Sequence, residues 1–123
     1  MLMKRVEEFY LDGKPFIYIN LSGIKNNNDF VEALNAIMPE IAKYPENSLY
    51  TITDISDVRL DSESKHIFTE CMKHNSRYVK FGAVIGVDGI KKIIVNSALK
   101  LSERTNMHFA FSKEKAIEWL TAQ

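Results

Sequence analysis

Residues 79–87, VKFGAVIGV, form the most hydrophobic run in the chain and constrain the fold more than any other segment. A strand that is apolar at nearly every position is buried on both of its faces, so other elements must cover it from both sides. Such strands occur chiefly in α/β proteins, where helices pack on the two faces of a sheet. We therefore predict an α/β fold with this run as the middle strand of the sheet.

The start of the chain is predicted to form a β-hairpin. Residues 4–11 and 16–22 have strand character, and Asp12 and Gly13 between them tolerate the positive φ angles of a tight turn. In the second arm, aliphatic residues alternate with aromatic and polar ones. We expect its aliphatic side to face the core.

The rest of the chain predicts helices and strands in alternation. Helix-capping residues at 26–29 precede an apolar pattern that runs to Ile41, and Pro39 within it is expected to kink the helix. Further helices are expected over Ser62–Arg77, Gly89–Glu103 and Lys113–Leu120, with strands at Leu49–Ile52 and Met107–Phe111. This order predicts a single domain spanning residues 1–123, with a five-stranded mixed sheet and four flanking helices.

The helix expected over Gly89–Glu103 has apolar residues on two sides. The larger stripe consists of Ile90, Ile93, Ile94, Ala98 and Leu101. Val95 and Leu99 form a smaller strip on roughly the opposite side. Such a helix is either deeply buried or lies at an interface. One interpretation is therefore a homodimer contact through this helix, which contains Val95 and Leu99.

Charge and cysteine content exclude several classes of protein. Sixteen Lys and Arg balance sixteen Asp and Glu, so the chain lacks the positive charge that attracts nucleic acid. No apolar run approaches the roughly 20 residues that span a bilayer, so no membrane insertion is expected. The single cysteine, Cys71, agrees with a reducing compartment and is expected to be a buried small hydrophobe. The expected location is cytoplasmic.

The segment Ser48–Lys65, SLYTITDISDVRLDSESK, holds the candidate functional loop. Its strand leads into a polar turn, and a second polar cluster precedes the next helix. Open α/β sheets place their functional groups in loops at the carboxyl ends of strands. The candidate residues of this loop are Asp54, Ser56, Asp57, Asp61 and Ser62.

Four segments carry a resemblance to a known family. The opening hairpin, DISDVRLDSES, FGAVIGVDG and the closing FAFSKEKAIEWL together resemble the SpoIIAA-like proteins, relatives of the STAS domain. The resemblance implies a sheet flanked by helices, as in anti-sigma factor antagonists and in lipid-binding domains of the Sec14 type. In antagonists, a partner kinase phosphorylates a serine that begins the helix after the central strand. Asp61 and Ser62 match that pair, whereas Glu63 and Lys65 stand where a small residue and a glycine are usual.

Two functions in different classes follow from these observations. The first is a regulatory module that binds a protein partner, such as a kinase or regulator, through the serine loop. The second is a carrier of a small apolar ligand or lipid, held in a groove beside Gly82 and Gly86. Each has a plainer structural alternative, because Asp61 and Ser62 also suit helix capping and the glycines also suit close packing.

No constellation typical of an enzyme is recognisable. His66 and His74 stand about two helical turns apart, too far for the adjacent-turn pairing of helical zinc motifs. His108 is distant in sequence, and no nucleophile-elbow pattern surrounds a serine. We expect a protein that is not an enzyme and has no metal or cofactor.

Overall fold

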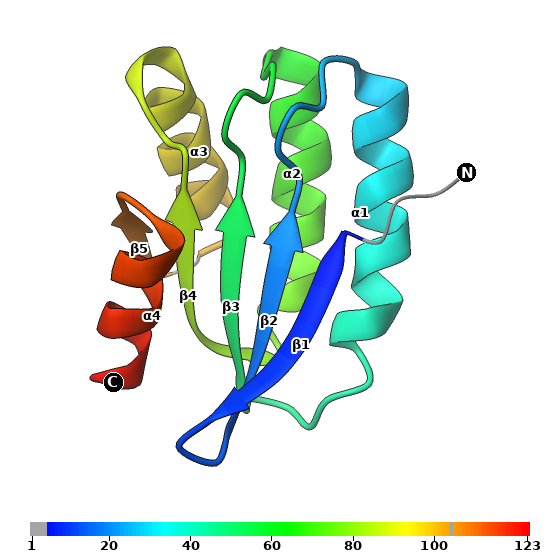
Figure 1. The fold of residues 1–123 in the computed structure, drawn as a ribbon. Helices are drawn as coiled ribbons and strands as arrows, with labels where there is room; N and C mark the ends of the chain where they lie inside the picture. The colour runs from blue at the N-terminus through cyan, green and yellow to red at the C-terminus, as the bar shows by residue number, and fades with distance from the viewer. Residues whose placement is uncertain (1–4, 104) are drawn as a thin grey trace.

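Five strands form one sheet in the order β1-β2-β3-β4-β5 in the computed structural model, which describes residues 5–103 and 105–123 (Figure 1). The strands are β1 (Val6–Leu11), β2 (Lys14–Asn20), β3 (Leu49–Asp54), β4 (Val79–Ile85) and β5 (Met107–Ala110). The helices are α1 (Asn27–Ile41), α2 (Ser62–Asn75), α3 (Gly89–Leu101) and α4 (Lys113–Thr121). Only β1 and β2 pair antiparallel; the other neighbours pair parallel. The predicted mixed sheet with four helices is confirmed.

The N-terminal hairpin is also confirmed. Asp12 and Gly13 form its turn with φ angles of 51° and 76°, the positive values that a two-residue hairpin turn requires. The second arm begins at Lys14 and ends at Asn20, two residues earlier at each end than predicted. Lys4, the predicted first residue of the hairpin, lies outside the described residues.

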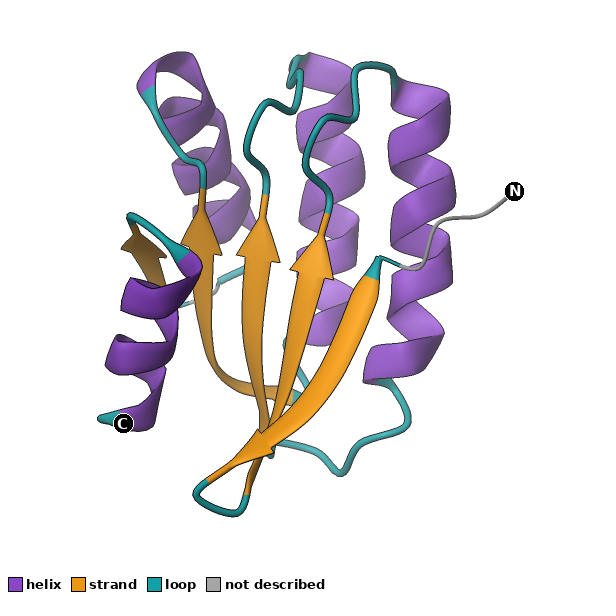
Figure 2. Ribbon diagram, in the orientation of Figure 1, coloured by secondary structure: helices purple, strands orange, loops and turns teal. Residues whose placement is uncertain are grey.

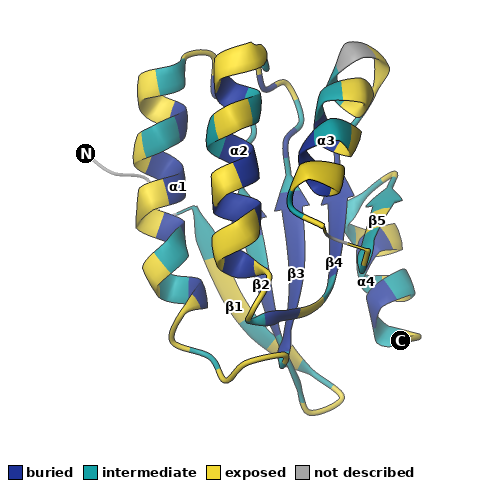
Figure 3. Ribbon diagram, turned by 180° about the vertical axis from the view of Figure 1, so that it is seen from behind, coloured by how far each residue is buried: buried dark blue, intermediate teal, exposed yellow. Residues whose placement is uncertain are grey.

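Helices cover the two faces of the sheet unequally. The helices α1, α2 and α3 lie on one face, and α4 alone lies on the other (Figure 2). Figure 3 views the molecule from the side of the three helices and shows β3 buried, whereas β1 at the edge is partly exposed. The sheet therefore has a large core on one face and a smaller one beneath α4.

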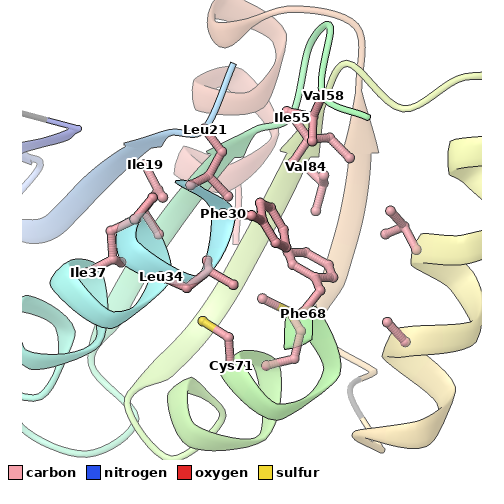
Figure 4. Close-up of a cluster of buried hydrophobic side chains, with 14 of the residues drawn as sticks. Ile19, Leu21, Phe30, Leu34, Ile37, Ile55, Val58, Phe68, Cys71 and Val84 are labelled. Atoms are coloured by element: carbon pink, nitrogen blue, oxygen red, sulfur yellow. The ribbon is translucent and has the colours of Figure 1, made fainter. Parts of the chain in front are cut away.

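The large core is centred on two aromatic rings. Phe30 of α1 and Phe68 of α2 are each 1% exposed, and their ring centroids are 6.3 Å apart. Figure 4 shows these rings facing each other in the centre of the cluster, between α1, α2 and the sheet. Cys71 belongs to this cluster and is buried, as predicted.

The middle strand is not the one predicted. The strand β3 is the middle strand, with two strands of the sheet on each side of it. The strand β4 lies between β3 and the edge strand β5. The exposure of Lys80 and the partial exposure of Phe81 show that β4 is less buried than β3, although its sequence is more apolar. Hydrophobicity therefore identified an interior strand but not its position, because that depends on which strands pair beside it.

The helix α3 buries its smaller apolar strip, together with Ala98 of the larger stripe. Val95 and Ala98 are fully buried and Leu99 is 8% exposed, whereas Ile93 and Leu101 are 71% and 56% exposed. Val95 and Leu99 pack into the chain's own core and leave the other side of the helix exposed, so a homodimer contact through this helix stays a prediction. The side chain of Ile90 lies outside the described residues.

Pro39 lies inside α1, as predicted. The helix continues through Pro39 and ends at Ile41, so the proline occupies its last turn. None of the described helices is long and apolar enough to cross a bilayer.

Candidate functional site

Three loops meet at one edge of the sheet. They follow β2, β3 and β4, and Figure 1 shows them side by side at the upper ends of these strands. The parallel register aligns Asn20, Asp54 and Ile85, so the three strands end at the same level. The candidate loop, residues 55–61, lies between the other two. The predicted placement of this loop at the carboxyl end of an interior strand is thus confirmed.

Asp54 ends β3 with its carboxylate held by two hydrogen bonds. The Tyr18 hydroxyl donates to one oxygen at 2.6 Å, and the backbone N–H of Ser56 donates to the other at 2.9 Å. Partial burial opposes ionisation, but these bonds outweigh it and hold the pKa of Asp54 below its ordinary value. The stabilisation from this carboxylate is therefore present above the unfolded-state pKa and is lost as the pH falls through the folded pKa. Asp54 is occupied in fixing the loop.

Ser56 is held between the neighbouring loops. Its carbonyl oxygen accepts a hydrogen bond from the N–H of Gly23 at 3.0 Å. On the other side its backbone lies against Gly86, so closely that a Cβ at Gly86 would collide with it. The ammonium of Lys91 donates to the carbonyl of Ile55 at 3.1 Å. Ser56 thus serves to anchor the loop.

Asp57 has a left-handed backbone and an exposed side chain. Its φ angle is 58°, and the Lys25 ammonium lies 2.6 Å from its carboxylate and 2.8 Å from its carbonyl oxygen. The hydrogen bond and charge of Lys25 lower the pKa of Asp57. Because both side chains are more than half exposed, solvent weakens this ion pair, which contributes little to stability.

In the second polar cluster, some residues cap α2 and others are exposed. Asp61 is the N-cap of α2 and accepts from the N–H of Ser64 at 3.0 Å, while the Ser64 hydroxyl accepts from the N–H of Asp61 at 2.6 Å. This reciprocal capping box leaves Ser62 as the first residue of the helix, with an exposed side chain. Among the hydrogen bonds of the described residues, none uses the Ser62 hydroxyl. Capping explains Asp61 and Ser64, but it does not explain Ser62.

Substitution by alanine should lower the stability strongly at Ser64 and hardly at all at Ser62. Ser64 is fully buried, so Ser64→Ala should lower the free energy of unfolding by about 1–2 kcal/mol, because the N–H of Asp61 loses its acceptor. Ser62→Ala should change it by less than about 0.5 kcal/mol, as exposed substitutions do. Urea unfolding of both variants measures the difference. Equal losses would show that Ser62 also has a structural role.

The predicted groove beside Gly82 and Gly86 is filled. A Cβ at Gly82 would lie 2.5 Å from the sulfur of Met107 and 2.8 Å from the Thr51 hydroxyl. The corresponding space at Gly86 is occupied by Ser56. The glycines allow close packing against the edge strand and the candidate loop, so no room for a ligand remains beside them. The packing alternative is the one the structure favours.

Several residues of this site were not predicted from sequence. Three of them come from other elements: Tyr18, Lys25 and Lys91. Tyr18 bonds to Asp54 at the end of β3, whereas Lys25 and Lys91 bond to Asp57 and Ile55 of the candidate loop. Only Tyr18 had a usable signal, because its place on the aromatic and polar side of the hairpin separates it from the large core. Ser64 could have been found from its spacing three residues after Asp61, which is that of a capping box.

The three histidines of the chain are all exposed. His66 and His74 are exposed on α2, and His108 is exposed on β5, where it stacks on Trp119. No cluster of three or more His, Cys, Asp or Glu side chains within the described ranges could hold a metal ion.

No protein-family model matches the chain, and no curated protein matches it. Its function is therefore inferred from the geometry of the site and from the sequence resemblance.

Proposed function

We propose that this chain is a non-catalytic regulatory module that binds a protein partner through the start of α2 and is switched by phosphorylation of Ser62. One observation carries the proposal: Ser62 begins α2 with an exposed side chain, while Asp61 and Ser64 perform the capping. A kinase could modify this hydroxyl without breaking a bond of the fold. The resemblance to anti-sigma factor antagonists supports the same position.

The charges around Ser62 indicate how such a switch works. A phosphate adds about −1.5 to −2 charges and is favoured by the partial positive charge of the helix N-terminus. Asp61 and Glu63 flank it in sequence, so the modified surface would carry three adjacent anionic groups. The Glu63 carboxylate already accepts from the amide of Asn27 at 2.9 Å, on the neighbouring helix α1. Phosphorylation would therefore make the shared surface of α1 and α2 repel a partner that binds its unphosphorylated form.

No observation favours the alternative, a carrier of Sec14-like type. Its predicted groove is filled by Met107, Thr51 and Ser56. The cores on both faces of the sheet contain side chains that are nearly inaccessible to solvent. A carrier would need space for an apolar ligand that this packing does not leave beside the two glycines.

The test compares four forms of the tagged protein: wild type, Ser62→Ala, Ser62→Asp and Asn35→Asp. Asn35 is exposed on α1, so its substitution adds the same charge at a different site. In quantitative affinity capture from the native host, at least one protein should bind wild type, Ser62→Ala and Asn35→Asp equally and Ser62→Asp at least tenfold less. Incubation with host lysate and ATP should phosphorylate wild type at Ser62. If Ser62→Asp retains the same proteins as wild type, the proposed switch is wrong.

A further inference from the structure

The free edge of β1 is a second surface with the features of a binding site. Apart from the hairpin contact with β2, no other element packs extensively against β1 within the described part of the chain. The strand is six residues long and contains no proline, lysine or irregularity of register. Proteins usually protect an edge strand with a proline, a lysine or an irregular register, or keep the strand as short as the four-residue β5.

The backbone groups at this edge follow from the register of the hairpin. The N–H of Asn20 donates to the carbonyl of Arg5 at 2.7 Å, which makes them a hydrogen-bonded pair. Such pairs alternate along an antiparallel ladder, so the next pairs bonded to β2 involve Glu7 and Phe9. The N–H and C=O groups of Val6, Glu8 and Tyr10 consequently point away from the sheet. They can bond to another strand.

Acidic side chains lie on both faces of the sheet at this edge. Glu7 shares its face with Tyr18 and lies 3.5 Å from the Lys113 ammonium, while Glu8 projects to the opposite face. Burial, and then the nearby charge of Glu8, raise the pKa of Tyr44 to about 12. Lys43 is nearby but binds Glu40 at 2.7 Å. No ion pair of the described residues involves Glu8.

A hollow of about 350 Å³ adjoins the same edge, and it is lined by Arg5, Val6, Glu7, Glu8, Tyr18 and Asn20. Arg5 contributes the only positive charge of this lining, and its guanidinium donates to the carbonyl of Asn20 at 3.0 Å. The two carboxylates would attract a long cationic side chain placed in the hollow.

A second copy of the chain fits this edge poorly. If two β1 strands paired antiparallel about a two-fold axis and used all three outward residues, Glu8 would oppose Glu8. Like charges directly opposite each other destabilise a strand pair. The acidic edge therefore disfavours self-association and favours a partner of the opposite charge.

We propose that the β1 edge binds an extended basic segment of another protein, which adds to the sheet as a sixth strand. Backbone bonds to Val6, Glu8 and Tyr10 supply the pairing, and Lys or Arg side chains at alternate positions, which share one face, lie on the face of Glu8 and neutralise it. One such side chain occupies the hollow. This surface is formed by different elements from the Ser62 site, so the proposal does not depend on the switch.

The test uses the peptide TKVKVKT, the acidic peptide TEVEVET, and a copy of the first that is N-methylated at alternate amides. Binding of TKVKVKT at physiological ionic strength should slow amide hydrogen exchange at Val6, Glu8 and Tyr10 at least tenfold. Exchange at Glu7 and Phe9, which already bond to β2, should not change. Glu8→Lys should weaken binding at least tenfold, whereas Glu32→Lys on the exposed side of α1 should alter it less than twofold.

Three results would each overturn the proposal. The first is that TKVKVKT does not bind at millimolar concentration. The second is that the N-methylated peptide binds equally well, because charge attraction without strand pairing would then explain the affinity. The third is that Val6, Glu8 and Tyr10 keep their exchange rates in the complex. The Ser62 switch can fail or succeed independently of all three.

Discussion

Gly86→Ala is expected to lower the free energy of unfolding by about 3 kcal/mol, the sum of a strained backbone and a collision. The φ angle of Gly86 is 82°, in the left-handed region where a side chain costs about 1–2 kcal/mol. The added Cβ would also meet the backbone of Ser56, which cannot move away easily. Ser56 is held there by its bonds to Asp54 and Gly23. Urea unfolding monitored by circular dichroism measures the loss.

Gly23→Ala is the matched control for this prediction. Gly23 has a φ angle of 80°, but no atom lies within 4 Å of the position that a Cβ would occupy. Gly23→Ala should therefore lower the free energy of unfolding only by the cost of the strained backbone, about 1–2 kcal/mol. If both variants lose the same amount, the contact between Gly86 and Ser56 is not what requires glycine. Because Ser56 anchors the candidate loop, Gly86→Ala should also shift the amide resonances of residues 55–58.

Phe68→Ala is expected to lower the free energy of unfolding by about 3–5 kcal/mol. Phe68 is 1% exposed and packs against Phe30, so truncation removes a buried ring and leaves a cavity in the large core. Ile55 and Val58 of the candidate loop belong to the same cluster, as Figure 4 shows. The loop should therefore also exchange its amide hydrogens faster in this variant.

Phe111→Ala provides the control for the loss of a phenyl ring. Phe111 is 100% exposed in the turn between β5 and α4, so its truncation should change stability by less than about 0.5 kcal/mol. A loss of under 1 kcal/mol in Phe68→Ala would contradict the assignment of Phe68 to the centre of the core. Thermal and urea unfolding of the two variants give the comparison.

Features set by neighbouring residues were predictable from sequence. Asp12 and Gly13 specify a hairpin turn because few residues accept positive φ. Asn26 and Ser112 each cap a helix by accepting a bond from the N–H three residues later, which requires only local geometry. The helix over Ser62–Arg77 accordingly starts where predicted and ends two residues early, at Asn75. Helix ends without a specific capping residue are less well defined.

Features set by distant residues were not predictable. The two apolar strips of α3 are both compatible with burial, and its packing in the large core decided that Val95 faces inward and Ile93 outward. Gly82 and Gly86 suggested an open groove, but their space is filled by Met107 and Ser56, which follow from strand pairing and loop contacts. Neither neighbour is visible in the sequence around Gly82 or Gly86.

The sequence by itself determined the order of strands and helices, the hairpin and the position of the serine loop at the end of an interior strand. These depend on periodicity, turn residues and caps, which act within a few residues. Only the tertiary structure decided that Ser62 remains exposed and without a bond among the described residues, and that Gly86 lies against Ser56. The physical reason is that the same residue types can cap, pack or project into solvent, and the contacts made in the folded chain select among these roles.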